Sequence, residues 1–100
     1  MNLIEHVLEC LNEECAEVIQ AACKVNRFAV KGAYPDGRGN VEVLSIELDD
    51  VLGVVELLQE LGLPITIGDR DRIEAKKRKL RQMMEVATER GSLRAGKEGE

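Results

Sequence analysis

The sequence predicts an all-α protein built from an antiparallel helical hairpin and a third helix. Three long segments repeat apolar side chains every three to four positions, which is the spacing of one helix face. Glycine and proline clusters separate these segments and are typical of the turns between helices. Residues 64–67 form the one β-like stretch, and a single strand cannot make a sheet.

The first helix is expected over residues 2–26. Asn2, followed three positions later by Glu5, has the spacing of an N-terminal cap. The expected apolar stripe comprises Ile4, Leu8, Leu11, Cys15, Val18 and Ala22, with Val7 and Ile19 beside them. Residues 27–39 interrupt the pattern with three glycines and a proline, which predicts a loop long enough to be functional.

The second helix is expected over residues 40–61. Asn40 is a favourable N-cap, and Gly62 with Pro64 ends the helix because neither residue continues it readily. The apolar face comprises Val43, Leu44, Val51, Val54, Val55, Leu58 and Leu61. The opposite, solvent-facing side carries Glu42, Asp49, Glu56 and Glu60.

The third helix is expected to begin at Asp69 or Asp71 and to continue to about residue 90. Its inward stripe comprises Ile73, Leu80, Met83, Met84 and Ala87. We expect residues 1–90 to form a single helical domain and the charged residues 91–100 to form a disordered tail. Such wide stripes leave apolar area uncovered in a 100-residue monomer. A four-helix core completed by a second subunit, in a homodimer or homotetramer, is therefore expected.

The composition argues against several classes of function. Nineteen acids against 14 Lys and Arg give a net charge of −5, which disfavours a nucleic-acid partner or an anionic membrane. No apolar run approaches the ~20 residues of a membrane-spanning helix, and the start lacks a basic leader, so a cytoplasmic protein is expected. Three cysteines without Cys-x-x-Cys spacing and a single histidine disfavour a disulfide framework or a zinc site.

Glu47 and Asp50 lie where a negative charge is unfavourable. Glu47 falls inside the apolar sector of the second helix, and Asp50 falls at the edge of that sector. A carboxylate in such a place needs a compensating cation. For one acid alone, an ion pair with a Lys or Arg of a neighbouring helix is the simpler interpretation.

The first helix carries a matching pair of acids, Glu14 and Glu17, beside its stripe. Both pairs are spaced i, i+3, so each pair projects two carboxylates in one direction. If the two helices pack antiparallel through their stripes, four carboxylates converge and need a cation between them. Carboxylate oxygens without His or Cys favour a hard ion, with Mg²⁺ first and Mn²⁺ as a substitute.

This arrangement resembles the signature of the MazG-like, all-α nucleotide pyrophosphohydrolases. The motif is Glu13-Glu14-x-x-Glu17, a spacer of 29 residues and Glu47-x-x-Asp50, and the likeness covers about residues 8–62. The resemblance implies an obligate oligomer, bound Mg²⁺, and cleavage of a nucleoside triphosphate to the monophosphate and pyrophosphate. It also implies a set of metal ligands, which are Glu14, Glu17, Glu47 and Asp50.

Other side chains are candidates to act on the substrate. Glu13, adjacent to the expected ligands but at a different azimuth, is the candidate catalytic residue, which would help to activate the attacking water or hold a further ion. Alternatively, Glu13 is a solvated surface acid. The candidate phosphate-binding residues are Lys24, Lys76 and Lys79, with Arg27, Lys31 and Asn40 in the loop as weaker candidates. Alternatively, the lysines of the third helix simply pair with the acids of the second. Phe28 and Tyr34 are the two aromatics available to pack against a base or to close the core.

Two alternative functions remain open at this point. The phosphoribosyl-ATP pyrophosphohydrolases share the carboxylate pattern and are similar in the same region. The chain is alternatively a non-catalytic helical interaction module, in which the acids form salt bridges with a partner protein.

Overall fold

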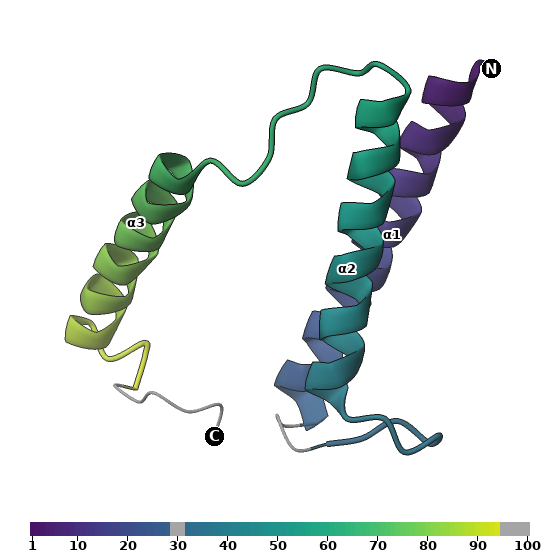
Figure 1. Cartoon of the computed structure of the whole chain (residues 1–100). Coiled ribbons are helices and arrows are strands. Elements are labelled where there is room, and N and C mark those ends of the chain that lie inside the picture. The colour runs from purple at the N-terminus through teal and green to yellow at the C-terminus, as the bar shows by residue number, and fades with distance from the viewer. Residues whose placement is uncertain (29–31, 95–100) are drawn as a thin grey trace. The chain divides into compact units, whose positions relative to one another are not determined.

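The structure, a computed structural model, describes residues 1–28 and 32–94 (Figure 1). It contains three helices, α1 (Leu3–Phe28), α2 (Asn40–Glu60) and α3 (Arg70–Glu89). The described residues contain no strand, only an isolated bridge between Ala33 and Gly39. The all-α class is confirmed, and each helix begins and ends within two residues of its expected bounds. Across the described part of the chain, no helix combines the length and apolarity needed to cross a membrane.

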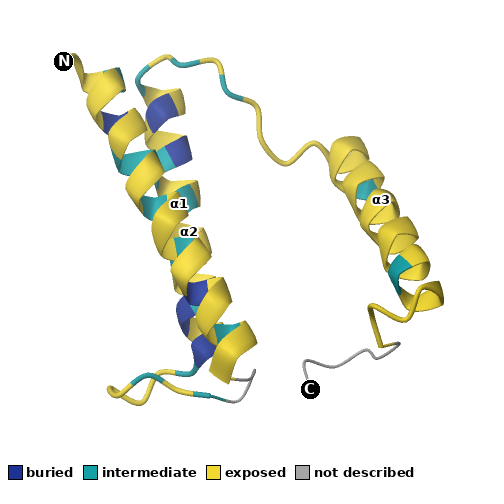
Figure 2. Ribbon diagram, turned by 180° about the vertical axis from the view of Figure 1, so that it is seen from behind, coloured by how far each residue is buried: buried dark blue, intermediate teal, exposed yellow. Residues whose placement is uncertain are grey.

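The chain divides into two compact units. The first, which begins at Met1 and extends to Ile65, contains α1 and α2 packed against each other as an antiparallel hairpin. The second begins at Thr66 and contains α3. Figure 2 shows that the buried residues lie on the two helices of the hairpin. The expectation that residues 1–90 form one domain stays a prediction.

Local signals account for the ends of the hairpin helices. The side chain of Asn2 accepts a 2.8 Å hydrogen bond from the Glu5 backbone N–H, which confirms the expected cap of α1. The end of α2 at Gly62 is also confirmed. Gly62 adopts a φ of 97°, and the N–H of Leu63 donates to the carbonyl of Leu58 at 3.0 Å. This left-handed closure favours glycine because it has no Cβ.

The expected N-cap of α2 is wrong. Gly39 occupies the cap position without a side-chain hydrogen bond, and Asn40 is the first helical residue, only 2% exposed. The Asn40 N–H donates to the carbonyl of Gly32 at 2.8 Å. This bond ties the start of α2 to the preceding loop and draws Asn40 into the interior, which the local cap signal does not reveal.

The core of the hairpin is a seam along the facing sides of α1 and α2. All seven apolar positions expected on α2 are buried or half-buried, which confirms that face. On α1 the expected stripe is partly wrong, because three of its six positions, Leu8, Cys15 and Ala22, are exposed. Ile19, expected beside the stripe, is exposed as well. The seam positions of α1 follow alternating steps of three and four: Ile4, Val7, Leu11, Glu14, Val18, Ala21 and Val25. Cys10, beside Leu11, is also half-buried.

The difference on α1 has a geometric reason. Steps averaging 3.5 residues form a seven-residue repeat, which keeps one seam against a neighbouring helix over many turns. Apolar residues stand at adjacent positions of α1, such as Ala21 and Ala22, so its sequence alone does not decide which face of the helix is covered. Packing along α2 selects the 3.5-residue repeat and brings Glu14 onto the seam, whereas the sequence placed Glu14 at its border.

The second unit consists mainly of α3. Asp69 caps the helix by accepting from the Arg72 N–H at 3.0 Å, so the earlier of the two expected starts is correct. No residue of α3 is buried, and its apolar side chains are largely exposed. Ser92 and Leu93 donate from their N–H groups to the carbonyl of Ala87, so these residues fold back on the helix end. Residues 95–100 of the expected tail lie outside the described residues.

Candidate functional site

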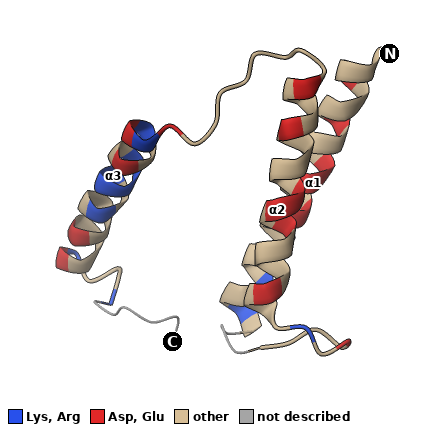
Figure 3. Cartoon of the chain, in the orientation of Figure 1, with Lys and Arg blue, Asp and Glu red and all other residues tan. Residues whose placement is uncertain are grey.

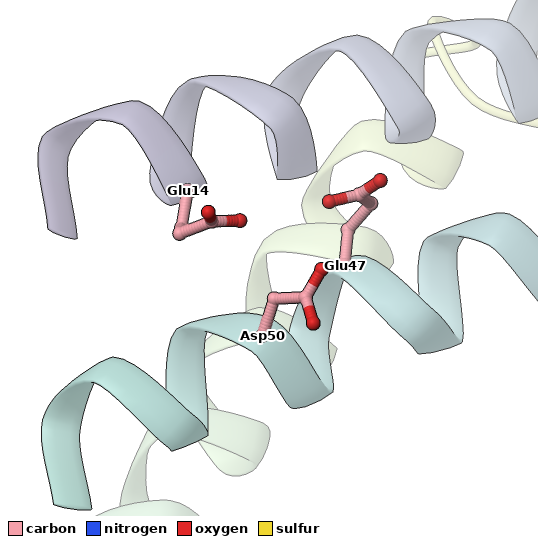
Figure 4. A group of neighbouring side chains, drawn as sticks. All are labelled: Glu14, Glu47 and Asp50. Carbon is pink, nitrogen blue, oxygen red and sulfur yellow. The ribbon is translucent and has the colours of Figure 1, made fainter. Parts of the chain in front are cut away.

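Three carboxylates meet between the two helices of the hairpin. One oxygen atom of each of Glu14, Glu47 and Asp50 lies within 4.8 Å of the other two. Figure 4 shows Glu14 projecting from α1 toward Glu47 and Asp50 on α2. Glu14 is far from Glu47 and Asp50 in the sequence, so the packing of α1 against α2 brings the three carboxylates together. We refer to these three residues as the acid cluster.

The seam positions explain why the acid cluster forms. Glu14 and Glu47 are half-buried within the covered faces of their helices, and Asp50 follows Glu47 by one helical turn at the exposed edge. The predicted convergence of acids from both helices is therefore realised for three of the four expected ligands. Glu17 lies outside this group and is exposed, but its charge still acts on Glu47. Glu13 is exposed beside it.

The electrostatics of the acid cluster centre on Glu47. Burial raises the pKa of the Glu47 carboxyl above its ordinary value, and the neighbouring charges of Asp50, Glu17 and Glu14 raise it further. The positive charge of Arg38 acts in the opposite direction. Glu47 is thus held where its ionised form is disfavoured, a position that a bound cation would relieve.

The raised pKa of Glu47 makes stability depend on pH. The folded chain binds the Glu47 proton more tightly than the unfolded chain, so this group lowers stability as pH rises through the window between the two pKa values. We expect the melting-temperature difference between Glu47→Gln and the parent to be largest above that window and to shrink below it. Circular-dichroism melts without divalent metal, from about pH 4 to pH 8, measure this difference. A difference that does not vary with pH would contradict the assignment.

The loop before α2 forms a short turn that carries two charged side chains. The Tyr34 N–H donates to the Arg38 carbonyl at 2.7 Å, and the Gly37 N–H donates to the Tyr34 carbonyl at 2.9 Å. Asp36 accepts from the Arg38 backbone N–H at 3.1 Å and pairs with its Nε at 2.8 Å. These hydrogen bonds, together with the Arg38 charge, lower the pKa of Asp36.

Two cations gather around the Tyr34 ring at this turn. Lys24 Nζ lies 4.3 Å from the ring centroid, and Arg38 Cζ lies 5.9 Å from it. Both distances are within the range of cation–π contacts. Lys24 was expected to bind phosphate, whereas Arg38 was missed. The Asp-Gly-Arg-Gly sequence around Arg38 indicates a turn, but it does not indicate the direction of the Arg38 side chain.

The other predicted site residues are distributed over both units of the chain. Arg27 Cζ is 5.8 Å from the ring centroid of Phe28, which is 59% exposed and so does not close the core of the hairpin. Lys76 and Lys79 are exposed on α3, in the second unit, and Lys31 lies outside the described residues. Figure 3 shows the contrast between the two units, with acids spread along both hairpin helices and basic residues abundant on α3.

Comparison of the chain with protein-family models, with curated proteins and with solved structures finds no match in any of the three. The resemblance to the MazG-like enzymes therefore stays a prediction that rests on the carboxylate motif itself.

Proposed function

We propose that this protein is a Mg²⁺-dependent nucleoside triphosphate pyrophosphohydrolase, which converts a nucleoside or deoxynucleoside triphosphate to the monophosphate and pyrophosphate. The observation that carries the proposal is the acid cluster, which joins Glu14 of α1 to Glu47 and Asp50 of α2. The same residues belong to the motif that resembles the MazG-like enzymes. Site and motif thus point to the same chemistry.

The acid cluster fits a hard divalent cation. Its donors are carboxylate oxygens, the ligands that Mg²⁺ prefers, and Mn²⁺ accepts the same set. One carboxylate oxygen of each residue lies within 4.8 Å of the other two, so the three side chains are close enough to share one cation. Glu14, Glu47 and Asp50 would hold the ion, with Glu17 as a further ligand. When bound, Mg²⁺ neutralises phosphate charge and polarises the phosphoryl group.

The remaining residues supply the functions that the ion does not. Glu13 is proposed to accept a proton from the attacking water. The cationic side chains proposed to bind the phosphates are Lys24, Arg27, Lys76 and Lys79. Phe28, with an exposed ring, is available to pack against the base, and Tyr34 already has Lys24 over its ring.

The proposal includes a homodimer or homotetramer. The apolar residues of α3 retain substantial exposure, among them Met83 at 57% and Met84 at 52%. A groove of about 450 Å³ on this helix is lined by Met83, Val86 and Ala87, with Lys79 among the residues around them. A second copy covering this apolar side would complete a four-helix core. Size-exclusion chromatography with light scattering at micromolar concentration is expected to give twice or four times the monomer mass, and a monomer alone would contradict it.

The experiment that tests the function measures pyrophosphate release from a panel of nucleoside and deoxynucleoside triphosphates with Mg²⁺. Turnover of at least one of them, abolished by chelation of the metal, is the expected result. Phosphoribosyl-ATP belongs in the panel, because turnover of that compound alone would favour the alternative enzyme. Absence of turnover on every compound would favour a non-catalytic interaction module.

Metal binding should also be visible without turnover. We expect millimolar Mg²⁺ to raise the melting temperature of the parent protein, because the ion binds the folded acid cluster and relieves its repulsion. Asp50→Asn should reduce that rise, whereas Asp49→Asn, on the exposed side of the same helix, should leave it unchanged. Scanning calorimetry at constant ionic strength measures the shift, and equal responses of the two variants would argue against the site.

A further inference from the structure

The loop before α2 holds the positively charged side chain of Arg38 through hydrogen bonds within the turn. The turn from Tyr34 to Arg38 is closed by two backbone hydrogen bonds, and Gly37 adopts a φ of 90° that glycine accommodates without strain. The bond from Asn40 to Gly32 joins the turn to the buried start of α2. The carboxylate of Asp36 accepts hydrogen bonds from the backbone N–H and from the Nε of Arg38, and these two contacts orient the Arg38 side chain.

Two positive charges and one negative charge gather at this turn. Lys24, from the end of α1, and Arg38, from the loop, both lie within cation–π distance of Tyr34. Two positive charges brought to one ring repel each other, and Asp36 pairs with Arg38. An anion bound between these side chains would relieve that repulsion.

This cationic group is also electrostatically coupled to the acid cluster. The Arg38 charge lowers the pKa of Glu47, although less than burial and the three neighbouring acids raise it. A metal-bound triphosphate carries more negative charge than one divalent ion neutralises, so its remaining oxygens need Arg or Lys nearby. Lys24 and Arg38 lie at the loop end of the hairpin, where α1 ends and α2 begins.

We propose that Arg38 and Lys24, held around the Tyr34 ring, form a binding site for the phosphate chain of the substrate, with Tyr34 and Asp36 as positioning residues. This inference rests on the proposed function and deepens it, because it assigns the phosphate chain to the loop end of the hairpin. Arg38 presents a planar guanidinium that matches two phosphate oxygens, and Lys24 adds a point charge. Tyr34 therefore acts on the phosphate-binding side chains rather than as a platform for the base.

The test measures binding of inorganic tripolyphosphate to the full chain by calorimetry, with Mg²⁺ present and without any nucleotide. Arg38→Gln is expected to weaken binding by about tenfold or more, and Arg38→Lys to recover part of the loss. Arg81→Gln, which removes the same charge from an exposed position on α3, is the matched control and should bind as the parent does. Melting curves of each variant verify that it folds.

A second pair of variants tests the positioning role of Tyr34. Tyr34→Phe keeps the ring and should keep the affinity, whereas Tyr34→Leu should weaken binding severalfold. In the turnover assay, Arg38→Gln should raise KM by about tenfold with a smaller change in kcat, because it removes binding common to substrate and transition state. Equal affinity of Tyr34→Leu and Tyr34→Phe would overturn the positioning role.

The outcomes separate this inference from the proposed function. Turnover by the parent together with unchanged KM and tripolyphosphate affinity in Arg38→Gln would overturn the inference and leave the hydrolase intact. Absence of turnover, with binding that still depends on Arg38, would support the anion site and overturn the hydrolase. A parent protein that binds no tripolyphosphate would overturn the inference outright.

Discussion

Glu47→Gln should abolish pyrophosphate release and, at the same time, raise the melting temperature of the metal-free protein at neutral pH. The two effects have one origin, since Glu47 is half-buried close to Glu14 and Asp50, where burial and the neighbouring acids raise its pKa and so disfavour its ionised form. Gln keeps the shape of the side chain and removes its charge. The repulsion involving Glu47 then disappears, and one of the proposed metal ligands is lost with it.

The expected loss of activity is large. Removing a hydrogen-bond partner of a metal ligand already costs about 10–100-fold in affinity or activity, so loss of a direct ligand should cost at least about 100-fold. Glu56→Gln, a change of the same kind at an exposed position of α2, should leave turnover within about twofold of the parent. Steady-state pyrophosphate release and calorimetric melts, measured on the same preparations, give both readouts.

Each half of this prediction can fail separately. A Glu47→Gln variant that retains turnover would remove Glu47 from the proposed metal site. A variant that loses turnover but melts at a lower temperature than the parent would mean that Glu47 has a stabilising partner in solution, in place of the repulsion expected from Glu14, Glu17 and Asp50.

Leu58→Ala should cause the largest loss of stability among single substitutions in the hairpin. Leu58 is 0% exposed and lies on the covered face of α2, where removal of its side chain leaves a cavity. Buried Leu-to-Ala changes cost about 2–5 kcal/mol, a large part of the 5–15 kcal/mol typical of a whole domain. We expect the melting temperature to fall by about 10 °C or more.

Leu57→Ala is the matched control for this change. Leu57 precedes Leu58 on the same turn but is 44% exposed, so the same truncation should cost less than about 1 kcal/mol. Urea denaturation followed by circular dichroism gives the free energy of unfolding of both variants. Equal losses at the two positions would contradict the packing of the hairpin through the Leu58 face.

The helices and their ends are the part of this fold that the sequence predicted best. The cap by Asn2 and the stop at Gly62 are both present as expected, because each depends on atoms within a few residues of the helix end. The N-cap of α2 is different. Asn40 has the right side chain for a cap, but the hydrogen bond to Gly32 and its burial place it inside the helix.

The candidate site was predicted in part. The azimuths of Glu47 and Asp50 follow from the apolar pattern of α2, which is continuous enough to fix the covered face. The phase of α1 was not fixed in this way, since apolar residues at adjacent positions permit more than one stripe. Consequently Glu17 was expected among the ligands on equal terms with Glu14, whereas Glu14 lies on the seam and Glu17 is exposed outside the acid cluster.

Local sequence accounts for the helical character of the chain, for the helix bounds to within two residues, and for the acids of α2 that depart from its solvent-facing side. These properties depend on local hydrogen bonding and on periodicity along one helix. Tertiary packing is what brings Glu14 opposite Glu47 and Asp50 and what holds Arg38 near Lys24 and Tyr34. Those relations join residues that are distant in sequence. They are set by how one helix packs on another and how the loop between them closes, which no local pattern encodes.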